Sequence, residues 1–165
     1  MDIFLDSMVY LKSVPVREID FCRMLGSDSV TVQLPRVTLR ELEQLKVSHP
    51  SSWTRDRAAQ VLACFDSLIT LGDQVHPGVD LHFISSTPHV EMAKYGLNPE
   101  WNDDWLIATV LEWKKSHSAA NTMLMTDGID ARLTCRHLQI DTVELPSKYR
   151  HQQVRNAEKY VGGLR

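Results

Sequence analysis

Strand-like and helix-like patterns alternate along almost all of this chain of 165 residues, and this alternation restricts its fold more than any other feature. Short apolar runs predict strands at 3–5, 30–35, 79–85, 122–126 and 140–145. Apolar residues at helical spacing predict helices at 16–25, 54–70, 105–115 and 130–138, with a short helix within 87–102. Such alternation is typical of βαβ units, so we expect an α/β protein with a mostly parallel central sheet.

Two local signals refine this outline. Thr38 and Glu41 have the spacing of a capping box and precede leucines that share one helix face, which predicts a helix that begins at Thr38. Asp6 stands at the end of the opening strand and interrupts the longer apolar run of 3–11. Residues 71–77 are expected to form a loop.

Composition indicates an ordinary globular protein. Hydrophobic residues make up 43% of the chain and charged residues 24%, and no apolar run approaches the roughly 18 residues that cross a bilayer, so we expect no membrane partner. The net charge of −3 lowers the expectation of non-specific polyanion binding without excluding nucleic acid. Cys22, Cys64 and Cys135 are too scattered for a disulfide framework or a zinc site, which favours a reducing, cytoplasmic location.

Carboxylates occupy four places where a strand should end or a helix should begin: Asp6, Glu41, the pair Asp103 and Asp104, and Asp127. Ligand sites in open α/β sheets lie beyond the carboxyl ends of the strands, so the topology can bring all four places to one rim. A carboxylate cluster without a paired His or Cys is the ligand set of Mg²⁺ or Mn²⁺, and these ions suit reactions of phosphates.

Each acid also has a simpler explanation. Glu41 can serve only the capping box, Asp104 can be a helix N-terminal acid that the macrodipole favours, and Asp127 before Gly128 can belong to a turn. Asp6 is harder to explain in this way, because a carboxylate buried without partners costs free energy. His137 is expected to be structural or solvated.

Four segments resemble, in order, the motifs of the PIN domain family. They read FLDSMVYL, LPRVTLRELEQLK, NDDWLIATVLEW and LMTDGIDARLTCRHLQI, and the resemblance covers about residues 1–146. It implies a three-layer α/β/α sandwich and a metal-dependent endoribonuclease that hydrolyses phosphodiester bonds. Residues 147–165 are then a polar C-terminal tail or helix outside the nuclease domain.

The resemblance also assigns roles to residues. Asp6, Glu41 and Asp104 match the metal-ligating positions, Asp103 is auxiliary, and Asp127 is the fourth acid. Ser7, Thr126 and Asp130 are expected to support these ligands or the attacking water. Two positions depart from the family pattern: Met8 replaces a polar residue, and Gly128 replaces the usual second acid of its segment, which leaves Asp127 or Asp130 to fill that role.

Basic and aromatic residues near the rim suggest how a substrate is held. Arginines and a lysine are candidate phosphate contacts, although a solvated helix face also explains such residues; they are Arg36, Arg40, Lys46, Arg132 and Arg136. The tryptophans can stack on bases or serve the core or a dimer face; they are Trp53, Trp101, Trp105 and Trp113. The resemblance favours RNA, single-stranded or structured, as the substrate, while the sequence itself does not distinguish RNA from DNA. Three alternatives stay open: a scaffold or partner-binding module without a full metal site, half of a homodimer, and a toxin nuclease held by an antitoxin.

Overall fold

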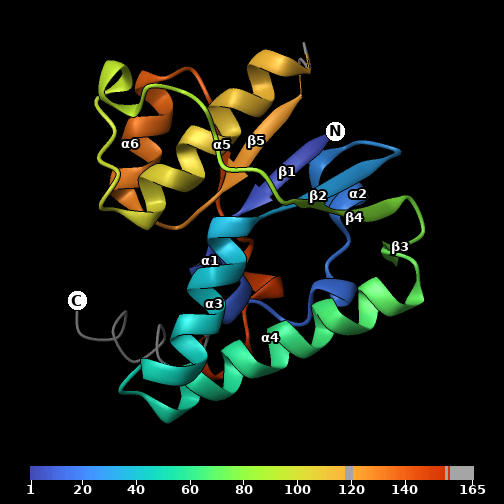
Figure 1. Ribbon diagram of the computed structural model, residues 1–165. Coiled ribbons are helices and arrows are strands. Elements are labelled where there is room, and N and C mark those ends of the chain that lie inside the picture. The colour runs from blue at the N-terminus through green and yellow to red at the C-terminus, as the bar shows by residue number, and fades with distance from the viewer. Residues whose placement is uncertain (118–120, 155, 157–165) are drawn as a thin grey trace, which may run out of the picture.

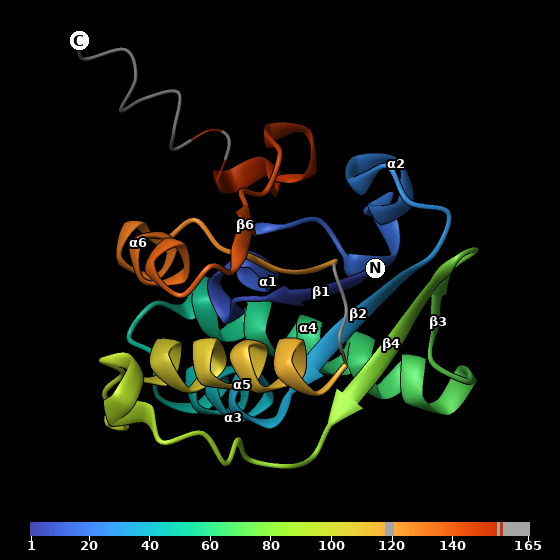
Figure 2. The same ribbon diagram turned by 90° about the horizontal axis from the view of Figure 1, so that it is seen from above.

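The computed structural model describes residues 1–117, 121–154 and 156, and its centre is a six-stranded sheet (Figure 1). The strand order is β3-β4-β2-β1-β5-β6, and all neighbours pair in parallel except β3 with β4. The strands are β1 (Asp2–Leu5), β2 (Val30–Pro35), β3 (Gln74–His76), β4 (Val79–Ile84), β5 (Thr122–Met125) and β6 (Asp141–Val143). Figure 2 shows β3 and β4 at one edge of the sheet and β6 toward the other.

Helices cover both faces of the sheet and complete the expected α/β/α sandwich. They are α1 (Ser7–Lys12), α2 (Phe21–Leu25), α3 (Arg36–Ser48), α4 (Ser52–Leu71), α5 (Asn102–Ser116) and α6 (Ile129–His137). Single 3-10 turns occur at Val16–Glu18, Met92–Tyr95 and Ser147–Tyr149. No helix in the described part of the chain is both long and apolar enough to cross a membrane.

Side-chain alternation along β1 shows how the core is divided. Ile3 and Leu5 are fully buried in the core cluster that also contains residues of α1, α3 and α4, while Phe4 belongs to the cluster formed with α5 and α6. A strand buried on both faces needs apolar residues at consecutive positions, which explains the unbroken apolar run at 3–5. Cys135 packs in the second cluster as a free thiol, and burial raises its pKa to about 12.

The opening strand is shorter than the apolar run that suggested it. β1 ends at Leu5, and Asp6 is the N-cap of α1, with its side chain accepting a hydrogen bond from the backbone N–H of Met8. The apolar residues after Asp6 therefore continue as a helix whose buried side chains include Val9 and Tyr10. An Asp at an N-cap satisfies a backbone donor that the helix itself leaves unpaired.

The capping box predicted at Thr38 does not form. α3 begins at Arg36, directly after β2, and its N-cap is Pro35, which makes no side-chain cap hydrogen bond. Thr38 is buried within the helix, and Glu41 lies in its second turn. Glu41 therefore does not cap α3, and its carboxylate belongs to the site described below.

Two other boundaries also differ from the predictions. The predicted helix at 16–25 is interrupted, because a 3-10 turn at Val16–Glu18 precedes α2. The predicted loop at 71–77 contains β3, since Gly72 and Asp73 take left-handed backbone conformations (φ 93° and 64°) that turn the chain back beside β4.

The residues after β6 fold back onto the end of α1, and we name residues 147–151 the C-terminal strap. The backbone N–H of Val14 donates to the carbonyl oxygen of Tyr149 (2.8 Å), and that of His151 donates to the carbonyl oxygen of Lys12 (2.6 Å). The hydroxyl of Tyr149, a buried residue, accepts from the backbone N–H of Asp20 (3.3 Å). The start of the predicted polar tail is therefore packed against the domain, while residues 155 and 157–165 lie outside the described part of the chain.

Candidate functional site

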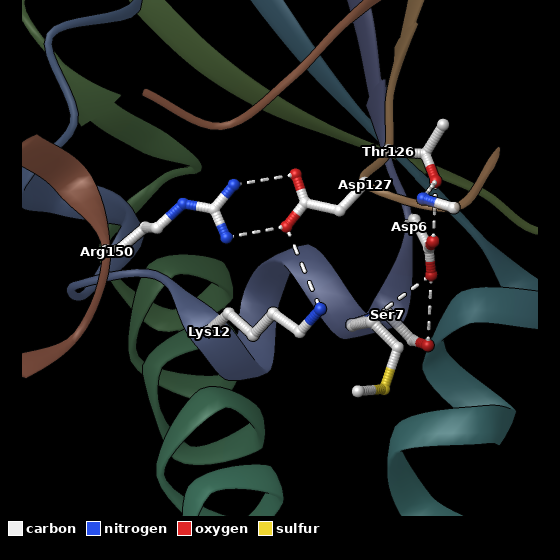
Figure 3. Close-up of polar contacts among 8 residues, drawn as sticks. Asp6, Ser7, Lys12, Thr126, Asp127 and Arg150 are labelled. Carbon is white, nitrogen blue, oxygen red and sulfur yellow. Dashed lines mark hydrogen bonds and ion pairs between the residues drawn. The ribbon is translucent and has the colours of Figure 1, made fainter. Parts of the chain in front are cut away.

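Asp6 and Thr126 meet where two neighbouring parallel strands end. Leu5 pairs with Met125 in the last register position of β1 and β5, and the backbone N–H of Asp6 then donates to the carbonyl oxygen of Met125 (3.0 Å). Asp6 Oδ2 accepts a hydrogen bond from the Thr126 hydroxyl at 2.9 Å, and Oδ1 accepts one from the Ser7 hydroxyl at 3.3 Å (Figure 3). Asp6 is only 8% exposed, so these donors stabilise a carboxylate that is largely removed from water.

Glu41 approaches this carboxylate from α3. Burial raises the pKa of Glu41, and the negative charges of Asp6 and Asp103 raise it further. The nearby polar side chains of Ser7 and Asn102 lower the pKa of Glu41 and so act in the opposite direction. The side chains of Asp6, Glu41 and Asp103 are therefore close enough to repel one another.

Asp103 and Asp104 lie in the first turn of α5. Asp104 is 7% exposed, and its Oδ2 accepts a hydrogen bond from the backbone N–H of Asn98 at 2.7 Å. Loss of hydration raises the pKa of Asp103, as do the charges of Asp6, Asp104 and Asp130. Asp130, in the first turn of α6, thus contributes to the same negative region from the opposite side.

The structure does not bring Asp127 into this cluster. Its carboxylate points away from Asp6 and forms an ion pair with Arg150, with N–O distances of 3.0 and 3.1 Å, while Lys12 Nζ lies 3.7 Å from Oδ2 (Figure 3). The backbone N–H of Thr126 still pairs with Val143, so the chain stays extended past β5. Adjacent residues of extended backbone point to opposite sides, and it is Thr126 that faces Asp6.

We name Asp6, Glu41, Asp103, Asp104 and Asp130 the acidic cluster, and a cavity of about 800 Å³ opens beside it. The cavity lies along α3 and the first half of α5, and Glu41 and Asn102 line it as well as contacting the cluster. Its wall includes Arg36 and Arg40 of α3. A concave site lined by two arginines and by Glu41 of the cluster can hold a phosphate chain next to the acids.

The other basic residues proposed as phosphate contacts lie elsewhere. Lys46 is exposed on α3 and is not among the described residues that line this cavity. Arg132 forms an ion pair with Glu144, and together with Arg136 it lines a separate cavity of about 490 Å³ beside β6. The presence of an arginine on a helix therefore did not predict whether it lines the large cavity, as Arg36 and Arg40 do, or the separate one beside β6.

The tryptophans also separate by location. Trp105 lines the large cavity, where its indole N–H donates to the carbonyl oxygen of Pro99 (2.8 Å), and Trp101 is 57% exposed just before α5. Trp113 packs against the core, and its indole N–H donates to Asp2 (3.0 Å). Trp53 lies against the C-terminal strap. Trp105 is thus the tryptophan placed to meet a substrate in the cavity.

A family model described as PIN domain matches residues 2–146. The chain belongs to the PIN domain family. Its fold is similar to that of a solved domain of a functionally unknown protein from Methanocaldococcus jannaschii DSM 2661, with 14% identity, a TM-score of 0.51, and coverage of 88% of this chain and 91% of that one. No curated protein sequence matches. PIN domains form a nuclease-type superfamily, and its nucleases usually use divalent metals.

The two departures from the PIN pattern have structural consequences. At Met8 the polar contact to Asp6 comes from the backbone N–H (3.0 Å), while the side chain is 41% exposed. Gly128 is the N-cap of α6, and its N–H donates to the Thr126 hydroxyl at 3.0 Å. Both residues therefore support the Asp6–Thr126 pair through main-chain donors rather than through side chains.

The acidic cluster has the donor chemistry that a PIN metal site requires. Its donors are all carboxylate oxygens, and burial and neighbouring carboxylates raise the pKa values of Glu41 and Asp103. Within residues 1–117, 121–154 and 156, no three His, Cys, Asp or Glu side chains are already grouped as metal ligands. Asp6, Glu41, Asp103 and Asp104 are the residues that would hold a divalent ion.

Sequence reasoning missed three contributors to this region. Asn102, at the start of α5, acts to lower the pKa of Glu41, and its position directly before the two acids was an available signal. Lys12 and Arg150 bind Asp127, and no local pattern indicated either residue. Their role depends on the strap returning to α1, which is a tertiary contact.

Proposed function

We propose that this PIN domain is an endoribonuclease that hydrolyses phosphodiester bonds with Mg²⁺ or Mn²⁺. One observation carries the proposal: Glu41, which belongs to a group of carboxylates close enough to repel one another, lines the same cavity as Arg36 and Arg40. Carboxylates in this arrangement suit a hard divalent ion, and guanidinium groups suit phosphate oxygens. Family membership supports nuclease chemistry at the level of the superfamily.

The residues of the site have separate tasks in this reaction. Asp6, held by Thr126 and by the N-terminus of α1, provides a fixed carboxylate, and the backbone N–H of Asn98 holds Asp104. Glu41 and Asp103 are the acids whose pKa values are raised by burial and by the neighbouring carboxylates. When bound, a divalent ion lowers the pKa of a coordinated water and offsets charge on the leaving oxygen.

The cavity wall places the substrate for this chemistry. Arg36 and Arg40 lie one helical turn apart on α3, so both guanidinium groups can contact successive phosphates of one strand. Trp105 presents its indole in the same cavity, where a base can stack. Stacking and phosphate contacts are the means by which proteins hold single strands, which favours an unpaired region of RNA.

The test is cleavage of a mixed-sequence RNA in Mg²⁺ or Mn²⁺, with and without EDTA. Asp104→Asn should abolish cleavage while keeping the acceptor for the N–H of Asn98 and hence the fold. Asp56→Asn, at an exposed position of α4, is the matched control and should cleave normally. Equal cleavage by the Asp104→Asn and Asp56→Asn proteins removes the cluster from catalysis. A DNA strand of the same sequence separates ribonuclease from general nuclease activity.

A second candidate function is a partner-binding module without catalysis. The observation that favours it is the lack of three pre-arranged metal ligands among the described residues. Thermal melting with added Mn²⁺ separates the two candidates, because an ion that binds only the folded state raises the melting temperature. A rise that disappears in Asp6→Asn supports the nuclease, and no rise at millimolar Mn²⁺ supports the module.

A further inference from the structure

The C-terminal strap lies beyond the residues that match the PIN family, yet its backbone is fixed on both sides of Arg150. Arg150 forms an isolated antiparallel bridge with Ser13, and the flanking residues Tyr149 and His151 exchange backbone hydrogen bonds with Val14 and Lys12. The strap thus pairs with the chain as it leaves α1. The backbone that carries Arg150 is therefore fixed by hydrogen bonds on both sides of this residue.

From this position Arg150 binds Asp127 with both ends of its guanidinium group. Nη2 lies 3.1 Å from Oδ1 and Nη1 lies 3.0 Å from Oδ2, and each side chain is only 14% exposed (Figure 3). Lys12 adds a second cation 3.7 Å from Oδ2. The contact through Nη2 is a hydrogen bond and the contact through Nη1 is an ion pair, and two contacts to the two carboxylate oxygens fix the orientation of Asp127 as well as its distance.

Asp127 adjoins the residue that orients Asp6. Thr126 is fully buried; its hydroxyl donates to Asp6 and accepts from the N–H of Gly128. The loop after β5 is therefore held on one side by the Asp127–Arg150 pair and on the other by the Thr126–Asp6 pair. A shift of Asp127 turns the shared peptide and moves the Thr126 hydroxyl relative to Asp6.

We propose that the C-terminal strap positions the acidic cluster, and that Arg150 does so through Asp127 and Thr126. Arg150 is a positioning residue in this proposal, because it acts through Asp127 and is not among the described residues that line the cavity. The inference rests on the proposed metal-dependent function. It predicts that loss of the Arg150–Asp127 pair weakens binding of a divalent ion at Asp6.

The opposite role, a strap that withholds Asp127 from the metal, conflicts with the backbone. Thr126 and Asp127 point to opposite sides of an extended chain, so Asp127 cannot reach the cluster while Thr126 holds Asp6. The two roles predict opposite signs for the same substitution. A withheld acid would make Arg150→Gln bind Mn²⁺ more tightly, and a positioning role makes it bind more weakly.

The experiment is titration of the full chain with Mn²⁺, followed by the electron paramagnetic resonance signal of the free ion. Arg150→Gln should raise the dissociation constant by about three- to tenfold, the range expected for a residue that acts through its neighbours. Arg150→Lys, which keeps the charge without the paired geometry, should fall between Arg150→Gln and the unchanged protein. If Arg150→Gln does not fold, the dissociation constant of Arg150→Lys serves as the test instead. Arg136→Gln, an exposed arginine of α6, is the control and should leave the constant unchanged.

A background without the connecting hydroxyl separates positioning from general stability. Thr126→Val should itself weaken Mn²⁺ binding by about tenfold or more, as loss of a residue that orients a ligand does. In that background Arg150→Gln should add no further loss. A further loss of the same size in both backgrounds overturns the proposed route, and tighter binding by Arg150→Gln overturns the positioning role. Absence of Mn²⁺ binding by the unchanged protein overturns the proposed function, and the inference with it, whereas binding that Arg150→Gln leaves unaltered overturns the inference alone.

Discussion

The hydroxyl of Thr126 lies 2.9 Å from Oδ2 of Asp6, a residue 120 positions earlier in the chain. The contact exists because β1 and β5 are neighbouring parallel strands that end at the same register position. Any residue one place beyond each strand end then meets the other at the sheet edge. The rest of the acidic cluster is arranged around this pair.

The acids of the cluster should make the metal-free protein less stable as pH rises. Burial and the neighbouring acids raise the pKa of Glu41 above its ordinary 4.5, so between 4.5 and the raised value the folded state binds more protons than the unfolded state. The free energy of unfolding therefore falls as pH increases through this window. Urea unfolding in EDTA, from pH 4.5 to neutral, measures the slope.

Glu41→Gln should reduce that slope and stabilise the metal-free protein at neutral pH, while it weakens Mn²⁺ binding. Asp56→Asn, at an exposed position of α4 outside the described lining of the cavity, is the control. If the free energy of unfolding falls with pH equally steeply in both variants, Glu41 is not the source of the slope.

The arginines of the cavity should contribute to RNA binding through phosphates. Arg36→Gln combined with Arg40→Gln should weaken binding to all sequences and reduce the slope of log K against log salt concentration by about 0.7 per cation removed. Lys46→Gln, on the same helix but outside the described lining of the cavity, should leave the slope nearly unchanged. Filter binding of a labelled RNA in EDTA at several salt concentrations measures the affinity and the slope. An equal effect of Lys46→Gln would show that any positive charge on α3 contributes equally, whether or not it lines the cavity.

An acid placed at residue 128 should strengthen the metal site. Gly128 has a φ of −69°, and an added Cβ would lie 3.4 Å from the Thr126 hydroxyl oxygen, so a side chain can be accommodated without backbone strain. Gly128→Asp supplies a carboxylate at the N-cap of α6, where a side-chain acceptor also stabilises the helix by a few tenths of a kcal/mol. Mn²⁺ should then bind more tightly.

Gly128→Asn separates charge from capping. It should give the same small change in unfolding free energy without the gain in Mn²⁺ affinity. Equal affinities for the two variants would show that residue 128 does not face the ion.

Removal of the buried Arg57 side chain should strongly lower the free energy of unfolding. It is 6% exposed on α4 and donates to the carbonyl oxygens of Leu11 (3.2 Å) and Ser13 (2.8 Å), which closes the C-terminus of α1. Arg57→Met leaves both carbonyls without this donor and should lower the free energy of unfolding by about 3 kcal/mol. Urea denaturation measures the loss, and Lys46→Met, at an exposed position, should change it by less than about 0.5 kcal/mol.

The central strands β1 and β2 could be predicted from the sequence because they are buried on both faces. Apolar runs such as 3–5 and 30–35 carry that requirement directly, and the predicted and observed strands agree closely. β3 could not be predicted in the same way. It is an exposed edge strand of three residues whose only buried side chain is Val75, so it carries almost no pattern.

The errors at the site arose where local spacing permits two structures. Thr38 and Glu41 fit a capping box, but the helix starts two residues earlier because Pro35 ends β2 with a backbone conformation that leads straight into α3. Asp127 looked equivalent to Asp6 as an acid after a strand. Which of two adjacent residues faces the site depends on how many positions the chain stays extended, and the hydrogen bond from Thr126 to Val143 decides this through a third strand.

Trp105 gives the cavity beside the acids an intrinsic optical reporter. Its indole lines the space and is anchored to Pro99, so a nucleotide that stacks there changes the fluorescence of a fixed ring rather than of a mobile one. Replacing the other three tryptophans by phenylalanine would isolate this emission. Substrate entry could then be timed in unlabelled protein, separately from any cleavage that follows.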